Sequence, residues 1–300
     1  MIGVAVGDAL GAPFEGAGSV SDRAWRKVAD AGDSLRFTDD THMTFGVIEA
    51  LLASEGFDEA MMAGIFMRNF EAEPWRGYGQ GPPRVFARIR EGVQWDRAAR
   101  QLYGGEGSYG NGAAMRVAPI GLRFHWDLER LTDLARRSAS ITHAHRLGQE
   151  GAALQAAAVA HAVSWGPPLV PTRFLQKLRE ESRASEFEMA LEKVESLVAS
   201  EEPDAVAARI GNGISALQAV PAALAAFLSN ADSFRDTIRF AIRMGGDTDT
   251  IASMAGALSG AYLGEEAIPA VWRSRTEGAR SMERLGGILF DHASAERHEP

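Results

Sequence analysis

The sequence predicts an all-α protein, a compact orthogonal bundle of many helices. Apolar residues recur at steps of three and four along most of the chain, which is the spacing of a helix face turned towards a core. Runs of β-branched residues bounded by turns are almost absent, so we expect no substantial sheet. Small residues crowd several predicted helices, as in residues 255–261, and allow helix backbones to approach closely.

The predicted helices follow one another through most of the chain. Eight segments carry the helical spacing: residues 43–52, 59–70, 128–139, 151–163, 187–198, 215–228, 234–242 and 251–262. Four aspartates precede helical segments as candidate N-caps: Asp58, Asp127, Asp204 and Asp232. The charged stretch 179–202 is typical of a pair of solvated helices.

We expect one domain over residues 1–300. Trp165-Gly166-Pro167-Pro168 interrupts the pattern and is predicted to be a loop, yet the sequence keeps the same helical character on both sides. The chain contains no low-complexity linker and no clear repeat.

The composition is that of a globular protein able to bury a large core, with 46% hydrophobic and 24% charged residues. The absence of cysteine excludes disulfides, thiolate metal sites and thiol nucleophiles, and fits a reducing cytoplasm. The first residues resemble neither a signal peptide nor a membrane span. A net charge of -9 argues against broad electrostatic binding of nucleic acid or anionic membrane. We therefore expect a cytoplasmic protein without nucleic-acid or membrane partners. The sequence contains no signal of oligomeric state, so a monomer is the default.

Two aspartate-rich strings, about two hundred residues apart, indicate the chemistry. They are Thr38-Asp39-Asp40-Thr41 and Gly245-Gly246-Asp247-Thr248-Asp249-Thr250, and neither contains a lysine or arginine. Carboxylate and hydroxyl oxygens are the ligands that hard divalent cations such as Mg²⁺ and Mn²⁺ prefer. Two such clusters predict one cation site that is assembled when the fold closes, and hence a metal-dependent enzyme.

Each aspartate cluster precedes a predicted helix. Thr38 is expected to cap the first helix, which puts Asp39 and Asp40 in its first turn, where the helix dipole favours negative charge. Capping alone would account for one such pair. Because the second cluster stands at the head of another helix in the same way, the two together predict a shared binuclear site.

An isoprenoid synthase is an alternative for an all-α chain with two aspartate-rich motifs, since its aspartates hold Mg²⁺ and a diphosphate. Those motifs space their aspartates about one helical turn apart. Here the aspartates are adjacent or alternate, which favours a helix-start loop.

A glycine-rich loop, Gly105-Glu106-Gly107-Ser108-Tyr109-Gly110-Asn111-Gly112, contains the GxGxxG pattern. The dinucleotide-binding form of this pattern follows a strand, whereas residues 97–102 are predicted to be helical, so we exclude a nicotinamide site. Backbone N–H groups of the loop can still surround a phosphate at the head of a helix beginning near Ala113. Tyr103 and Tyr109 flank the loop and could stack on a nucleobase; ordinary packing is the alternative.

Histidines are predicted to play a minor part. Thr142-His143-Ala144-His145 has neither cysteine nor a third clustered histidine, so no zinc site is expected. His143 is predicted to contact a polar ligand, and ordinary structural roles are predicted for His42, His145 and His161. Arg116 is either an interior ion-pair partner or a ligand contact.

Taken together, these strings resemble the ADP-ribosylglycohydrolase (ADP-ribosylhydrolase) family along nearly the whole chain. Besides the two aspartate clusters, four further strings match in order: Val6-Gly7-Asp8-Ala9-Leu10-Gly11-Ala12-Pro13-Phe14-Glu15, Arg76-Gly77-Tyr78-Gly79-Gln80-Gly81, Ser108-Tyr109-Gly110-Asn111-Gly112-Ala113-Ala114-Met115-Arg116, and Thr142-His143. Residues 77–81, residues 108–122 and the last predicted helix are most similar to the branch that removes serine-linked ADP-ribose and cleaves poly(ADP-ribose) or O-acetyl-ADP-ribose.

The resemblance implies an all-α fold with two Mg²⁺ (or Mn²⁺) in a central cleft. By matching positions, the metal ligands would be Glu15, Thr38, Asp39, Asp40, Asp247, Asp249 and Thr250, with Glu15 on a flap. The diphosphate would be held by Gly107, Ser108, Gly110, Asn111 and Gly112, the adenine by Tyr103 and Tyr109, and the distal ribose by His143.

The implied reaction is hydrolysis of the glycosidic bond at ribose C1 of ADP-ribose-containing small molecules or ADP-ribosylated proteins. Glu15 or Asp247 would activate water or protonate the leaving oxygen. The alternatives are the same fold acting on arginine-linked ADP-ribose, and a non-catalytic ADP-ribose-binding relative, which would require broken metal ligands. Glu73-Pro74-Trp75-Arg76 and Pro82-Pro83 depart from the family pattern and are expected to alter the rim of the cleft.

Overall fold

The fold is all-α, as predicted. The computed structural model describes residues 1–54, 57–198 and 202–297. Within these ranges β-structure is limited to two isolated bridges, Leu35 with Thr276 and Gly110 with Ser215. None of the helices in the described ranges has the length and apolarity needed to cross a membrane.

In chain order the α-helices are α1 (Ile2–Gly11), α2 (Asp22–Ala29), α3 (Asp39–Ala53), α4 (Glu59–Ala72), α5 (Gly81–Arg90), α6 (Trp95–Ala98), α7 (Ala118–Arg123), α8 (Leu128–Ser140), α9 (Arg146–Ser164), α10 (Pro171–Glu181), α11 (Ser185–Leu197), α12 (Pro203–Ile210), α13 (Ala216–Ser229), α14 (Phe234–Arg243), α15 (Thr248–Leu263), α16 (Ala270–Arg275) and α17 (Ala279–Arg297). Short 3-10 helices are η1 (Ala12–Phe14), η2 (Ala99–Gln101), η3 (Tyr103–Gly105), η4 (Asn111–Ala113) and η5 (Glu265–Ala267).

All eight predicted helical segments are confirmed, in α3, α4, α8, α9, α11, α13, α14 and α15. Asp58 and Asp127 cap α4 and α8 as expected. The other two predicted caps are wrong. Asp204 lies inside α12, because Pro203 already opens that helix, and Ser233 rather than Asp232 caps α14 through its hydroxyl. Residues 199–201 of the predicted charged helix pair lie outside the described residues.

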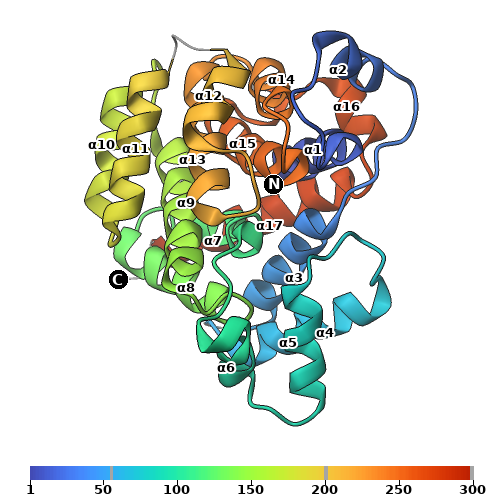
Figure 1. Ribbon diagram of the computed structural model, residues 1–300, viewed down its shortest axis with the longest axis vertical. Coiled ribbons are helices and arrows are strands. Elements are labelled where there is room, and N and C mark those ends of the chain that lie inside the picture. The colour runs from blue at the N-terminus through green and yellow to red at the C-terminus, as the bar shows by residue number, and fades with distance from the viewer. Residues whose placement is uncertain (55–56, 199–201, 298–300) are drawn as a thin grey trace.

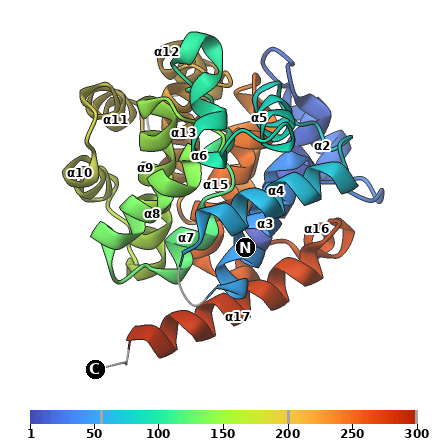
Figure 2. The ribbon, with the colours of Figure 1, turned by 90° about the horizontal axis from the view of Figure 1, so that it is seen from below.

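Helix α15 is at the centre of the bundle. It packs against α1, α9, α13 and α14, and α1 in turn contacts α3 and α17. Figure 1 shows α1 and α15 in the middle of the molecule, with α9 and α13 to one side and α3 to α5 below. Figure 2 shows α17 extending along one side of this bundle.

Glycines allow α1 and α15 to approach closely. A Cβ atom at Gly7 would lie 2.1 Å from the Ala252 carbonyl oxygen, and one at Gly3 would lie 2.1 Å from the Gly256 oxygen. Because the opposing atoms belong to the backbone, only glycine fits at these positions. The contact fixes α1, which carries Asp8, against the helix that begins at the second aspartate cluster.

Candidate metal centre and ligand cleft

The first aspartate cluster stands at the head of α3, where Thr38 is the N-cap as predicted. Asp8 of α1 holds it there. The Asp8 carboxylate accepts hydrogen bonds from the backbone N–H groups of Thr38 and Thr41, both at 3.0 Å, and from their hydroxyls at 2.9 and 2.6 Å. These bonds satisfy free N–H groups of the first turn of α3 and orient Asp39 and Asp40.

The second cluster stands at the head of α15, where Asp247 is the N-cap and Asp249 lies in the first turn. Gly245 and Gly246 before it have φ values of +70° and +72°, which favour glycine. Gly246 accepts a hydrogen bond from Gly16 N at 2.8 Å and donates one to Ala17 O at 2.9 Å. This pairing brings the segment that carries Glu15 against the second cluster.

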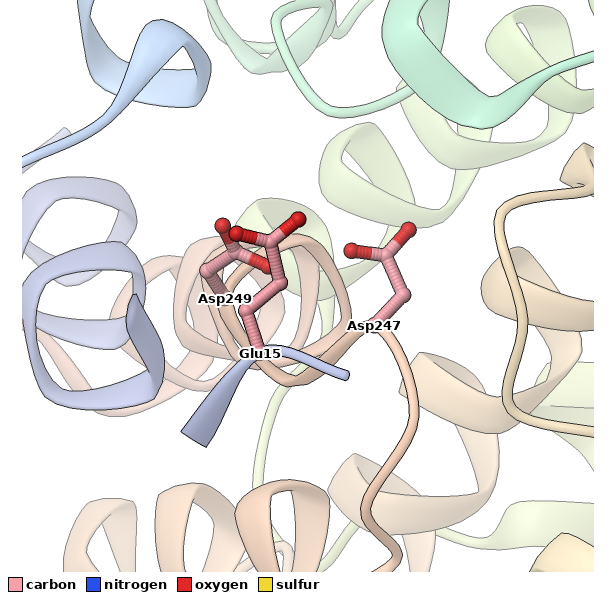
Figure 3. Close-up of side chains that lie close together, drawn as sticks. All are labelled: Glu15, Asp247 and Asp249. Carbon is pink, nitrogen blue, oxygen red and sulfur yellow. The ribbon is translucent and has the colours of Figure 1, made fainter. Parts of the chain in front are cut away.

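The fold brings the carboxylates of both clusters together. Ligand atoms of Glu15, Asp247 and Asp249 lie within 4.8 Å of one another, and Figure 3 shows Glu15, which directly follows η1, beside the two aspartates at the start of α15. The Thr250 hydroxyl donates to Asp40 Oδ2 at 3.3 Å and so joins the two clusters directly. The prediction that the clusters meet when the fold closes is confirmed.

The electrostatics of this group fit a divalent cation. Burial, followed by the charges of Asp8 and Asp247, raises the pKa of Asp39 from 3.8 to about 8. Burial and Asp247 raise the pKa of Asp249 to about 9, and burial and neighbouring carboxylates place the pKa of Asp40 well above its usual value. Among the described residues, Asp40 Oδ1 is buried without a hydrogen-bond partner. A cation bound between these oxygens would remove both penalties.

The glycine loop forms the opposite wall of the cleft. Gly107 has φ +75°, and a Cβ there would lie 2.7 Å from the Ala144 Cβ, so the loop packs tightly before α9. Asn111 N donates to Ile214 O at 2.9 Å, and Asn111 Nδ2 donates to Asp247 Oδ2 at 2.5 Å. The loop is therefore tied to the second aspartate cluster.

The prediction of a helix that begins near Ala113 is wrong. Only the 3-10 turn η4 lies there, and the following α-helix, α7, starts at Ala118. Pro119 is the second residue of α7, where the N–H that proline lacks would have had no partner within the helix. An anion in the loop would meet individual backbone N–H groups rather than the head of an α-helix.

His143 is buried beside the glycine loop, with Nδ1 2.7 Å from the Thr142 hydroxyl. Burial, followed by the charge of Arg116, lowers its pKa to about 3, so its imidazole is neutral. Arg116 is fully buried and donates to the Gly112 and Ser138 carbonyl oxygens at 3.3 and 3.0 Å. Arg116 therefore bonds two carbonyl oxygens at the edge of the cleft and does not form the interior ion pair that was one of its two predicted roles.

One cleft gathers most of the predicted site residues. It is lined by Glu15, Asp39, Asp40, Tyr103, Ser108, Gly110, Asn111, Gly112, His143, Asp247, Asp249 and Thr250. Three predicted site residues stand outside this lining. Thr38 is turned towards Asp8, Gly107 packs behind the loop, and Tyr109 is 57% exposed with its ring edge on His145.

The cleft is also lined by residues to which the sequence assigns no role: Met43, Gly77, Gly79, Gln80, Gly81, Met115 and Ile214. Pro82 lies at the rim, as expected, whereas Pro83 is outside the lining. Ile214 is 73% exposed at the edge of the cleft, and an isolated aliphatic residue gives no sequence pattern that would identify it. The three histidines expected to be structural include His42, whose Nδ1 lies 2.9 Å from the Tyr78 hydroxyl, and His145, which caps α9.

Known proteins resemble this chain over nearly its full length. A family model described as ADP-ribosylglycohydrolase matches residues 1–299. ADP-ribosylhydrolase ARH3 of Xenopus tropicalis is 35% identical over 328 residues, covering 96% of this chain and 93% of the relative. ADP-ribosylhydrolase ARH3 of Homo sapiens is 36% identical over 289 residues, covering 86% and 79%. A solved structure described as an ADP-ribosylglycohydrolase-related protein complex has a TM-score of 0.77 and 28% identity, covering 97% and 95% of the two chains.

Proposed function

Because this chain belongs to the ADP-ribosylglycohydrolase family and is a hydrolase that acts on ADP-ribose, we propose that it uses two divalent cations to cleave the glycosidic bond at ribose C1. The substrates we propose are serine-linked ADP-ribose, poly(ADP-ribose) and O-acetyl-ADP-ribose. The observation that carries the proposal is the junction of the two aspartate clusters, where Thr250 bonds Asp40.

The proposed ions are Mg²⁺, with Mn²⁺ as a substitute. The residues that would hold them are Glu15, Thr38, Asp39, Asp40, Asp247, Asp249 and Thr250. Their oxygen-only chemistry suits these hard cations, and the unpartnered Asp40 Oδ1 offers a further ligand. Bound there, such ions supply positive charge that orients the ribose hydroxyls and lowers the pKa of a nearby water.

The protein's own groups would move the protons. Hydrolysis adds water oxygen to ribose C1 and needs one proton removed from water and one delivered to the leaving oxygen. Glu15 and Asp247 are the carboxylates we propose for these transfers, because they converge on one point (Figure 3). Asn111 fixes Asp247 by donating to Oδ2, which leaves its other oxygen available to the reaction.

The rest of the cleft would bind the ADP-ribosyl group. Backbone N–H groups between Gly107 and Gly112 are proposed to hold the diphosphate, in a chain whose net charge of -9 offers no general attraction for it. Tyr103 lines the cleft and Tyr109 lies just outside its lining, and each exposes more than half of its surface. We propose that the adenine stacks on these rings. Neutral His143 is proposed to line the distal ribose pocket.

The linkage is tested by measuring ADP-ribose release from matched serine-linked and arginine-linked peptides, with Mg²⁺ and with EDTA. We expect release from the serine-linked peptide alone, and only with metal. Release from arginine alone would keep the metal site but overturn the proposed substrate. Binding of ADP-ribose without release from either peptide would support the non-catalytic alternative.

Several predictions from the sequence remain proposals beside this function. We propose one domain over residues 1–300, a cytoplasmic monomer, and no nucleic-acid or membrane partner. The single span of the family match supports one domain, the absence of cysteine fits the cytoplasm, and the net charge of -9 argues against nucleic acid and anionic membrane. The monomer is the default.

A further inference from the structure

A buried arginine lies outside the proposed reaction yet touches three separate segments. The Arg76 side chain is 7% exposed, and its Nη1 and Nη2 atoms donate to the two Glu277 carboxylate oxygens at 2.8 and 2.9 Å. Its Nε donates to Glu73 Oε2 at 2.5 Å. A forked pair with a buried guanidinium restrains the relative position of its two side chains more than a single, fully exposed ion pair does.

The same guanidinium supports the first aspartate cluster from behind. It stacks 3.9 Å from the centre of the Phe37 ring and donates to the Phe37 carbonyl oxygen at 3.2 Å. Phe37 directly precedes Thr38. The next residue in the rim segment, Gly77, lies against Asp39, because a Cβ there would be 3.8 Å from Asp39 Oδ1. Arg76 thus joins the rim of the cleft to the proposed metal-binding loop.

Glu277 is itself held against this loop by backbone bonds. Leu35 N donates to Arg275 O at 3.0 Å, and Glu277 N donates to Leu35 O at 2.9 Å, which forms the isolated bridge of Leu35 with Thr276. The junction of α16 and α17 is therefore docked on the segment that leads into Thr38. Glu277 provides a fixed anchor for Arg76 that does not depend on the rest of the cleft.

We propose that the Arg76–Glu277 pair is a positioning element of the metal site, which holds the first aspartate cluster and Gly77 in register with Asp247 and Asp249. This inference rests on the proposed metal site. A cation site needs its ligands held within a few tenths of an ångström, and loss of residues that orient ligands typically weakens metal binding about 10–100-fold. If the pair only stabilised the fold, its loss would lower stability and leave metal affinity unchanged.

The chain offers a matched control. Arg123 of α7 is 4% exposed and pairs with Glu296 of α17 through one hydrogen bond at 2.5 Å, whereas Arg76 pairs with Glu277 through two. Glu296 is 27% exposed and Glu277 is 34% exposed. The two pairs differ in what their arginines hold: Arg76 donates to the Phe37 carbonyl oxygen next to Thr38, whereas Arg123 donates to the Leu51 carbonyl oxygen near the far end of α3. Glu277→Gln and Glu296→Gln therefore remove the same charge from two similar pairs, of which one adjoins the metal site.

The test is the Kd for Mn²⁺, measured by electron paramagnetic resonance on the full chain and on both variants, alongside urea unfolding. We expect Glu277→Gln to raise the Kd roughly tenfold, Glu296→Gln to leave it unchanged, and both to lower stability by similar amounts. At saturating Mn²⁺, the kcat of Glu277→Gln should return close to the wild-type value. Arg76→Lys, which keeps the charge but loses the fork, should raise the Kd as well.

Equal Kd values in wild type and Glu277→Gln would overturn the positioning role, and so would equal increases in both glutamine variants. Failure of the wild-type chain to bind Mn²⁺ would overturn the metal assignment and this inference with it. The wild-type titration thus separates failure of the proposed function from failure of the positioning role alone.

Discussion

The contact of α1 with α15 predicts that Gly7→Ala separates the two halves of the metal site. In the interior of an α-helix, replacing glycine by alanine normally stabilises by roughly 0.5–1 kcal/mol. At Gly7 the new methyl carbon would lie 2.1 Å from the Ala252 oxygen and 2.5 Å from its carbonyl carbon, whereas ordinary contacts begin at 3.4 Å. Neither backbone atom can rotate away.

Relief of this overlap requires the helices to move apart by roughly 1 Å, which is the kind of overpacking that costs about 1–3 kcal/mol or more. We therefore expect Gly7→Ala to lower the free energy of unfolding by about 1–2 kcal/mol once the helix-propensity gain is subtracted. Because α1 carries Asp8 and α15 carries Asp249, the same movement should weaken Mn²⁺ binding.

Gly64→Ala is the control. Gly64 lies in the exposed part of α4, where an added Cβ meets nothing within 4 Å, so this variant should be more stable than wild type by up to about 1 kcal/mol. Urea unfolding followed by circular dichroism compares the three proteins. If Gly7→Ala proved as stable as Gly64→Ala, the packing argument would be refuted.

Three further outcomes follow from the site. Asp247→Asn should lower kcat roughly 100-fold or more while leaving the far-ultraviolet circular dichroism unchanged, and near-normal turnover would rule out its assigned role. In EDTA, thermal stability should fall as pH rises from about 4 to about 9. The pKa values of Asp39 and Asp249 in the folded state are about 8 and about 9, above the value of 3.8 in the unfolded state. The folded state therefore binds more protons in that pH window, and raising the pH destabilises it. Mg²⁺ should suppress that loss, and a melting temperature independent of pH in EDTA would contradict the assigned charges. Tyr109→Ala should weaken ADP-ribose binding about tenfold, as loss of one base-stacking contact does, without changing stability, and unchanged affinity in calorimetry would remove this residue from the adenine site.

Local patterns predicted eight of the 17 α-helices in the described ranges, because one buried face imposes a period on the sequence. Periodicity did not predict helix α1, because all ten of its residues are buried and no polar face alternates with an apolar one. The helix expected at Ala113 failed for a local reason as well: the turn residues before Pro119 form only a 3-10 turn.

The candidate site likewise has parts that local sequence patterns predict and parts that they do not. The aspartate clusters and the glycine loop are local strings, and the sequence alone indicated their chemistry. Asp8 could not be assigned, because a single aspartate in an apolar helix has no local partner and its bonds reach Thr38 and Thr41, some 30 residues away. The Arg76–Glu277 pair spans 201 positions, and only the folded chain brings its members together.

The most direct test of the account is to rebuild the metal site in metal-free protein. Mn²⁺ is added stepwise after treatment with EDTA, and ADP-ribose release from a serine-linked peptide is measured together with the number of ions bound. We expect no release in EDTA and a rate that rises to a plateau at about two ions per chain. Full activity in the presence of EDTA would contradict the proposed metal-dependent reaction.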